Sequence, residues 1–444
     1  MKITPLIGLL GLALAHVSFA QNTNTTWPFS ANTLPGIYDD DFPPATDQPR
    51  RSVLQQRVID ANEAGDYVTA GGVGLVVIAN ENPDDALRLT IANSLAWTGK
   101  LKEAAPAYLS LTRGSLANEA NVGLGNLNRW RGRDDQAVSF FRSVLANDPA
   151  NAGALEGLEL ATRELSPRTT IGFGRMSDSS DMLRRSTSTN HRWRDASGVH
   201  LFEVEMGGIR DALPTNNASQ QDMTGRYQGL DLPLKPSIEI SMPTGVDQTL
   251  HGTAKVTLLD ESVTLGVGRV NWAKLATNPN ALIAGLSAKY LGATVAQPTS
   301  TGHITGRVNY YDISDGNTIL TSSANFDSAW RPFGRRYKPY MGFETRTAHF
   351  STPNYWSPDQ GSGTAYAGLL GEWSEANWSL FASAQLSTRL YGDASNGWSV
   401  SAGGKRWLTN DIALGTNLWA MENSRDSSRY KSQSLMVNLE KLWR

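Results

Sequence analysis

Cysteine is absent from this sequence of 444 residues, and histidine is scarce, at 6 residues. The lack of cysteine excludes disulfide cross-links, thiolate metal sites and thiol nucleophiles. No histidine pair has the His-x-x-x-His spacing of a zinc site, and no phosphate loop ends in Gly-Lys-Ser or Gly-Lys-Thr. The histidines after residue 20 belong to no recognisable nucleophile motif: His191, His200, His251, His303 and His349. We therefore expect no catalytic residue, no metal site and no cofactor.

Long hydrophobic runs are also missing after residue 20, where no stretch approaches the ~18 apolar residues of a membrane-spanning helix. At the start of the chain, Lys2, an apolar run over 6–17 and the small residue Ala20 predict a secretory signal peptide, 1–20. Residues 21–48 are rich in Asn, Thr, Pro and Asp, which indicates a flexible leader without a core. The formal net charge of −2 does not favour a nucleic-acid partner.

Residues 49–165 repeat with a period of 34 and then 33 residues, as measured between Gly65, Gly99 and Gly132. Each glycine opens a turn between two expected helices, and an alanine follows five residues later. This spacing predicts tetratricopeptide-like helical hairpins, with residues 152–165 as a final capping helix. In the first unit, Gly74 stands where the later units have an aromatic residue. The repeat motif of the second and third units comprises Trp97, Gly99, Ala104, Tyr108, Trp130, Gly132, Ala137 and Phe141. The two tryptophans fit either the core or a partner-binding surface.

From residue 168 to 444 the pattern changes to short alternating stretches separated by polar turns, which predicts strands joined as hairpins. We expect about sixteen strands. A further strand is expected near 281–291, and the region 186–245 holds three more. The clearest strands are expected near 169–178, 199–210, 250–259, 262–272, 301–311, 317–328, 336–349, 363–373, 378–389, 397–407, 411–421 and 432–443.

Tryptophan placement favours a membrane barrel over a soluble β-sandwich. Of the 13 tryptophans, those at expected strand ends lie where the aromatic girdles of a membrane barrel belong. These are Trp272, Trp373, Trp378, Trp407, Trp419 and Trp443. The last strand alternates Leu435, Val437 and Leu439 before Trp443, and Lys441 on the same face can extend to the interface. We therefore predict an antiparallel transmembrane β-barrel after the helical repeats, with lipid around it.

This arrangement resembles the outer-membrane exporters of bacterial exopolysaccharides. They include cellulose synthase operon protein C, the poly-N-acetylglucosamine exporter and the YaiO-type family. The residues 95–99 (Leu-Ala-Trp-Thr-Gly) and 127–132 (Leu-Asn-Arg-Trp-Arg-Gly) are similar to the Trp-x-Gly repeats of that group. Asn354 and the segment Tyr355, Trp356, Ser357 and Pro358 are similar to its Tyr-Phe-Ser-Pro segment. The chain departs from the large exporters in having about three repeats.

The resemblance implies that a polysaccharide passes through the barrel lumen to the cell surface. It places the repeats in the periplasm, where they recruit periplasmic or inner-membrane synthase components. Tyr355–Pro358 either folds inward as a constriction or forms a rigid turn at the interface. The arginines of the expected inward faces either line the lumen or pair with Glu344 and Glu372: Arg331, Arg335, Arg336, Arg346, Arg389 and Arg406.

Two other functions remain open at this point. Surface lipoprotein assembly modifiers also join repeats to a barrel, of about fourteen strands, and translocate protein. A plain diffusion porin has no need for the repeats. The expected strand count and the two motifs favour the polysaccharide exporter.

Overall fold

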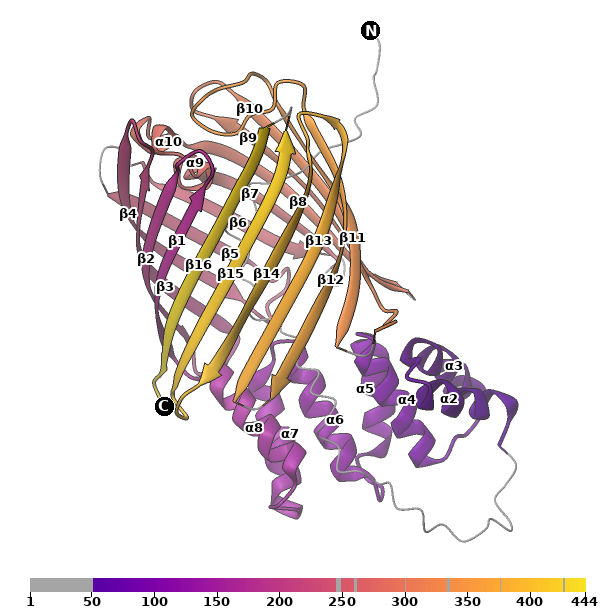
Figure 1. The fold of residues 1–444 in the computed structure, drawn as a ribbon. Coiled ribbons are helices and arrows are strands. Elements are labelled where there is room, and N and C mark those ends of the chain that lie inside the picture. The colour runs from indigo at the N-terminus through magenta and orange to yellow at the C-terminus, as the bar shows by residue number, and fades with distance from the viewer. Residues whose placement is uncertain are drawn as a thin grey trace. The chain divides into compact units, whose positions relative to one another are not determined.

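The computed structural model describes residues 51–244, 249–258, 262–299, 301–333, 336–375, 377–425 and 428–444. The expected signal peptide and the leader lie outside these described residues, as does Arg335. The chain divides into two compact units, a helical unit that ends at Leu165 and a barrel unit that continues from Ser166 (Figure 1). The predicted order, helices followed by a barrel, is confirmed.

Antiparallel helix pairs build the helical unit. Gly65, Gly99 and Gly132 have φ of 74°, 82° and 73°, so each turn uses the left-handed backbone conformation that glycine adopts without strain. The described helices are α2 (Val53–Glu63), α3 (Tyr67–Asn80), α4 (Asp85–Trp97), α5 (Leu101–Leu111), α6 (Ala117–Trp130), α7 (Asp134–Asn147) and α8 (Ala152–Leu165). None of them is long and apolar enough to cross a membrane.

The aromatic residues of the repeat motif pack against glycines on the neighbouring helices. Phe141 is fully buried between Gly125 and Gly157, where an added methyl group would come within 2.5 Å and 2.3 Å of its ring. Tyr108 lies in the same way against Gly123, at 2.3 Å. Because glycine has no side chain, the aromatic ring fits against it and the helices pack close together.

The other motif residues are also placed in this packing. Ala104 and Ala137 are fully buried. Trp97 meets Tyr67 edge-on with ring centroids 4.8 Å apart, and Trp130 packs, partly buried, against the core of the helical unit. Both tryptophans therefore contribute to the packing between helices, which was one of the two interpretations of the sequence.

Sixteen antiparallel strands close into a barrel in chain order, and β1 pairs with β16. Closure leaves no strand edge exposed. The strands are β1 (Arg168–Asp178), β2 (Leu183–Arg194), β3 (His200–Ala212), β4 (Asn217–Gly229), β5 (Ser237–Thr244), β6 (His251–Leu258), β7 (Val263–Val270), β8 (Ala288–Thr299), β9 (Gly302–Ile313), β10 (Thr318–Ser328), β11 (Tyr337–Ala348), β12 (Ser362–Glu375), β13 (Trp378–Gly392), β14 (Asn396–Trp407), β15 (Ile412–Arg425) and β16 (Ser428–Leu442).

The expected strand near 281–291 is wrong in its position. Residues Pro279–Ile283 form the short helix α10, and β8 starts only at Ala288. A second short helix, α9 (Trp272–Ala276), precedes it in the connection from β7 to β8. The aliphatic residues of this stretch are buried against other side chains, as in a strand, but on helical turns.

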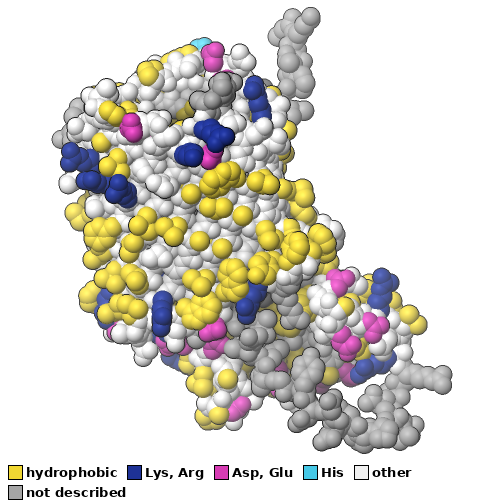
Figure 2. All heavy atoms as spheres, in the orientation of Figure 1, with side chains coloured by type: hydrophobic (Ala, Val, Ile, Leu, Met, Phe, Trp, Pro, Cys, Tyr) yellow, Lys and Arg dark blue, Asp and Glu magenta, His cyan; other side chains and the backbone are white. Residues whose placement is uncertain are grey.

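Many strands have one mainly apolar and one mainly polar face, as the alternation predicts. On β11, for example, Met341 and Phe343 are exposed on one face, while Tyr340, Glu344 and Arg346 share the other. Figure 2 shows the hydrophobic side chains gathered as a broad region around the outside of the barrel. We call the apolar series outward and the polar series inward. The outward series matches the lipid-facing belt of a membrane barrel.

Outward aromatic residues cluster near the barrel end that carries the C-terminus. Trp193 stacks on Phe202 at 5.6 Å, and Phe202 lies 5.5 Å from Tyr227, across β2, β3 and β4. Trp373, Trp378 and Trp443 also belong to the outward series. The girdle assignment is wrong for the other three tryptophans, since Trp407 and Trp419 belong to the inward series and Trp272 lies on α9.

Candidate functional site: the barrel lumen and its inward loop

The connection from β7 to β8 folds into the barrel. On one side, Lys274 of α9 forms an ion pair with Asp222 of β4 at 2.8 Å. Arg184 of β2 donates to the Lys274 carbonyl oxygen at 3.0 Å, and it also holds Asp211 of β3, with N–O distances of 2.6 and 2.7 Å. Asp222, Arg184 and Asp211 all belong to the inward series.

The same loop contacts the opposite part of the wall. Trp272 is 3% exposed, and its ring centroid lies 5.0 Å from Tyr311 of β9 and 5.5 Å from Tyr355. Arg184 belongs to β2, and six strands separate β2 from β9 on one side of the barrel and eight on the other, so a loop that contacts both crosses the interior. Figure 1 shows α9 and α10 at the barrel end opposite the C-terminus. The α9–α10 loop, residues 271–287, therefore narrows the lumen near that end.

Local sequence signals set the shape of this loop. Asn271 and Asn278 cap the two short helices, since their side-chain oxygens accept from the backbone N–H of Lys274 and Asn280. Pro279 occupies the first turn of α10, and Thr277 between the helices adopts a left-handed φ of 52°. The two capping asparagines indicate two helices, whereas the aliphatic residues of 281–291 favoured the prediction of a strand.

The segment Tyr355–Pro358 lies in the connection from β11 to β12 and packs against the α9–α10 loop. Tyr355 is 3% exposed, and its hydroxyl donates to Asp315 at 2.8 Å. Burial, followed by this hydrogen bond, raises the pKa of Tyr355 above its usual range. The Ser357 hydroxyl accepts from the Thr352 backbone N–H at 2.7 Å, which fixes the turn. The segment is therefore a hydrogen-bonded turn whose Tyr355 ring contacts the α9–α10 loop.

Arg346 joins the two loops. Its side chain is 2% exposed, and its guanidinium lies 5.7 Å from the ring centroid of Trp272 and 5.2 Å from that of Trp356. Aromatic faces attract a cation at these distances. We call Arg346, Trp272, Tyr355 and Trp356 the aromatic collar. Its members come from three places in the sequence, and the fold brings them together.

The other predicted arginines are dispersed. Arg389 belongs to the inward series opposite Thr364, and Arg336 is exposed next to the start of β11. Arg331 lies in the connection from β10 to β11, where burial lowers its pKa, while the charges of Glu372 and Asp327 act in the opposite direction. Arg406 is an error of the sequence prediction, since it shares the outward series with Val400 and pairs with Leu414.

Among the described residues, no ion pair joins these arginines to Glu344 or Glu372. Glu372 lies 3.7 Å from Lys338. The inward ion-pair cluster of β3, β4 and β5 instead centres on Arg226, which binds Glu203, Glu205 at 2.7 Å and Glu239 at 2.7 Å. The alternation predicted a strand near 199–210 but not this cluster, because the partner strands follow only from the register.

Aromatic and uncharged polar groups line the wall near the collar. The Tyr290 hydroxyl donates to Asn309 at 3.3 Å, and its ring lies 5.5 Å from Tyr311. On β11 and β12, Tyr340 and Tyr366 face each other at 6.4 Å. Tyrosine rings and hydroxyls from β8, β9, β11 and β12 therefore lie on the inner wall of the barrel.

Comparison with known proteins identifies the fold. No family model matches this sequence, and no curated protein matches it. A solved structure described as a bacterial polysaccharide outer membrane secretin is 11% identical, with a TM-score of 0.50, and the match covers 63% of this chain and 99% of that chain. The CymD monoaromatic hydrocarbon channel is 9% identical with a TM-score of 0.34, over 65% of this chain and 91% of that chain. OccK2 (OpdF) of Pseudomonas aeruginosa, in complex with glucuronate, is 11% identical with a TM-score of 0.36, over 63% and 98%. The barrel unit of this chain has the fold of an outer-membrane β-barrel channel.

Proposed function

We propose that this protein is an outer-membrane channel that exports an exopolysaccharide of the cellulose or poly-N-acetylglucosamine type. The observation that carries the proposal is the part of the inner wall near the aromatic collar, where the tyrosines of β8, β9, β11 and β12 lie among uncharged hydrogen-bonding groups. The likeness to the polysaccharide secretin supports it, because it extends over 99% of that chain.

A neutral glycan has hydroxyl groups at its rim and apolar faces on its sugar rings. Tyrosine and tryptophan rings can stack on those faces, and Asn and Tyr side chains exchange hydrogen bonds with the hydroxyls. Conduction requires many such contacts, each weak enough to release the chain. A lumen of this composition suits a neutral polymer better than a dense ring of single-sign charge would.

In this proposal the aromatic collar is the constriction. Trp272 and Tyr355 are buried against each other, and together with Arg346 they hold the α9–α10 loop in place inside the lumen. Ser357 and Pro358 hold the turn that carries Tyr355 and Trp356. Arg331, Arg336 and Arg389 contribute charge to other parts of the wall.

The helical unit serves as the docking domain. We assign it to the periplasm, where stacked helical hairpins bind synthase components and raise their concentration near the channel. Synthesis behind the growing polymer drives it outward. The competing function, a surface lipoprotein assembly modifier, was expected to have about fourteen strands, whereas this barrel has sixteen.

Single-channel recording in a planar bilayer tests the proposal. We expect cello-oligosaccharides or chito-oligosaccharides to cause brief current blockades whose frequency rises with concentration. Tyr340 and Tyr366 are half-buried members of the inward series. The Tyr340→Ala and Tyr366→Ala variants should shorten the blockades about three- to tenfold, since a sugar ring stacked on an aromatic ring contributes roughly 1 kcal/mol. The proposal fails if the wild-type current is unaffected by every glycan while the channel conducts ions.

A further inference from the structure

Three arginines lie side by side on the outside of the barrel. Arg175 of β1 is directly opposite Arg185 of β2, and Arg185 is directly opposite Arg210 of β3. All three are exposed members of the outward series. Since adjacent strands lie about 4.8 Å apart, the row extends over roughly 10 Å. We call these three residues the arginine ridge.

The arginine ridge has no compensating charge within the part of the chain that the structure describes. No hydrogen bond or ion pair there involves the side chain of Arg175, Arg185 or Arg210. Like charges directly opposite each other on neighbouring strands destabilise a sheet. Other outward cations near the same barrel end do have acids, since Lys289 binds Asp312 at 2.9 Å. Glu422 likewise receives Arg429 at 3.6 Å and Lys431 at 3.4 Å. An anion bound from outside the protein would reduce the repulsion between these three arginines.

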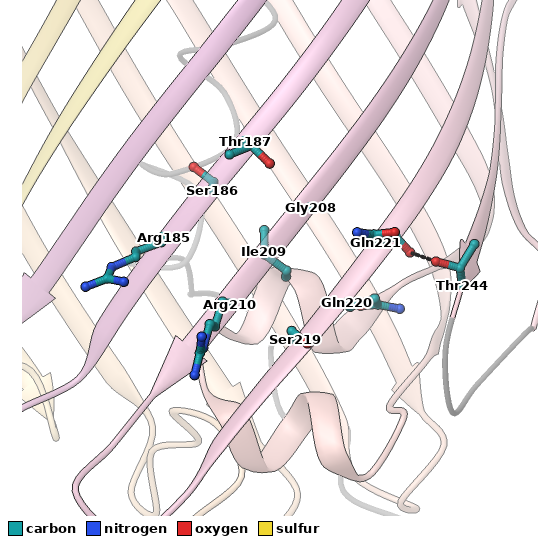
Figure 3. Close-up of a pocket in the computed structure, with 10 residues that line it drawn as sticks. All are labelled: Arg185, Ser186, Thr187, Gly208, Ile209, Arg210, Ser219, Gln220, Gln221 and Thr244. Atoms are coloured by element: carbon teal, nitrogen blue, oxygen red, sulfur yellow. Dashed lines mark hydrogen bonds between the residues drawn. The ribbon is translucent and has the colours of Figure 1, made fainter.

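A hollow on the outer face extends from the ridge. Arg185 and Arg210 line it together with the outward side chains of Thr187, Ser219, Gln221 and Thr244. Figure 3 shows the two arginine side chains next to each other at one end of this hollow, with Gln221 and Thr244 at the other. Hydroxyl and amide groups therefore supply further donors beside the two guanidinium groups.

The ridge lies at the border of the lipid-facing region. On β1, Phe173 is the next outward residue toward the C-terminal end of the barrel, and it is 59% exposed. Met206 of β3 and Met223 of β4 continue this apolar surface at 64% and 48% exposure. An anion at the ridge would therefore sit at headgroup level, with an apolar surface directly beside it for acyl chains.

We propose that the arginine ridge binds the phosphate monoesters of a glycolipid headgroup whose acyl chains lie on Phe173, Met206 and Met223. Guanidinium groups bind phosphate oxygens in pairs, which suits a row of arginines better than a row of lysines. A phosphodiester lipid carries one negative charge, whereas a phosphate monoester carries about −1.5 to −2, so a headgroup with two of them balances three arginines. We place the ridge in the outer leaflet, and this placement rests on the periplasmic helical unit of the proposed function. The binding chemistry does not depend on it.

The test is a binding measurement on the full-length protein in detergent, by native mass spectrometry. The probes are bisphosphorylated lipid A, phosphatidylglycerol and inorganic phosphate. We expect the variant R175Q/R185Q/R210Q to bind bisphosphorylated lipid A at least about tenfold more weakly than the wild type. The matched control K289Q/R429Q/K431Q removes the same charge from cations that have acidic partners, and it should bind as the wild type does.

Three results would overturn the proposal. The first is undiminished lipid A binding by the ridge variant, and the second is an equal loss in the control, which indicates a general charge effect. The third is a preference for phosphatidylglycerol or inorganic phosphate over lipid A. Heat-resistant migration on gels verifies that each barrel is folded, and the single variant R185Q replaces the triple variant if the latter does not assemble. Because no polysaccharide passes through the barrel in this assay, its outcome is independent of the export proposal.

Discussion

Single residues show how far the sequence alone could assign the lumen. The alternation in β11 predicts that Tyr340, Glu344 and Arg346 share one face, and the structure agrees. The pattern does not state which face is inward, because a shift of one residue reverses every side chain. Arg406 was misassigned for this reason. The collar was beyond prediction, since the contact of Arg346 with Trp272 joins residues that only closure of the barrel brings together.

Arg346 should influence ion selectivity if it lies at the constriction. Replacing it by glutamine, R346Q, removes a positive charge from the collar, so the permeability for cations relative to anions should rise by about two- to fivefold. Reversal potentials in a salt gradient measure this ratio. The outward variant R406Q removes the same charge from the lipid-facing side and should leave the ratio unchanged. Equal shifts in both variants would show that Arg346 does not face the ion path.

Some glycines of the helical unit pack against an aromatic ring, whereas others have no neighbour near the position of a side chain. Replacement by alanine should therefore have opposite effects at the two kinds of position. Gly157→Ala places a methyl group 2.3 Å from the Phe141 ring and should destabilise the unit by about 1–3 kcal/mol. Gly72→Ala meets nothing within 4 Å and should stabilise α3 by up to ~1 kcal/mol, the difference in helix propensity. Hydrogen exchange in α7 and α8 of the full chain measures the first effect. Equal protection in the two variants contradicts the packing of Phe141 described above.

At the scale of elements, the α9–α10 loop contradicts the strand that the sequence predicted near 281–291. The aliphatic residues of 281–291 suggested a strand, but the apolar cluster that they join is inside the barrel end, around Trp272 and Tyr311. A short apolar run fits a strand and a buried helix equally well. Asn271 and Asn278 cap the two helices, and an asparagine before a short apolar run is a sequence signal for a helix start.

The loop should control conductance if it narrows the lumen. Replacing residues 272–286 by a short Gly-Ser linker removes the ring of Trp272 and the ion pair of Lys274 with Asp222. We expect the single-channel conductance to rise about twofold or more, because the narrowest section dominates the resistance of a pore. Heat-resistant migration on gels serves as the folding control. A folded variant with wild-type conductance would place the constriction elsewhere.

At the scale of the whole molecule, the order of helices and barrel and the number of strands followed from the sequence. The repeated glycines at Gly65, Gly99 and Gly132 fixed the helical turns, and the period-two alternation fixed the strands. Periodicity is a local property that any single sequence displays. The ion-pair cluster of Arg226 and the arginine ridge needed the register between strands, which is a property of the closed barrel.

The proposed docking role of the helical unit can be tested by deleting that unit. Deleting residues 49–165 should leave an inserted, heat-resistant barrel, because every strand pair lies within the barrel unit. Export in cells should nevertheless fall, since the local concentration of partners at the channel is lost. Cell fractionation and an assay of surface polysaccharide measure the two effects. A barrel that no longer assembles would show that the helices are needed for folding, and the recruitment role would lose its support.

The most direct test of the central claim is deletion of the gene, scored for surface polysaccharide and surface lipoproteins in the same cells. Polysaccharide export predicts that extracellular glycan is lost, that glycan accumulates in the periplasm, and that lipoproteins reach the surface normally. Reintroducing the wild-type gene should restore the glycan, whereas a copy with Trp272→Ala and Tyr355→Ala should restore it only in part. Normal surface glycan together with lipoproteins retained inside the cell would contradict the account and identify the protein as a lipoprotein assembly modifier.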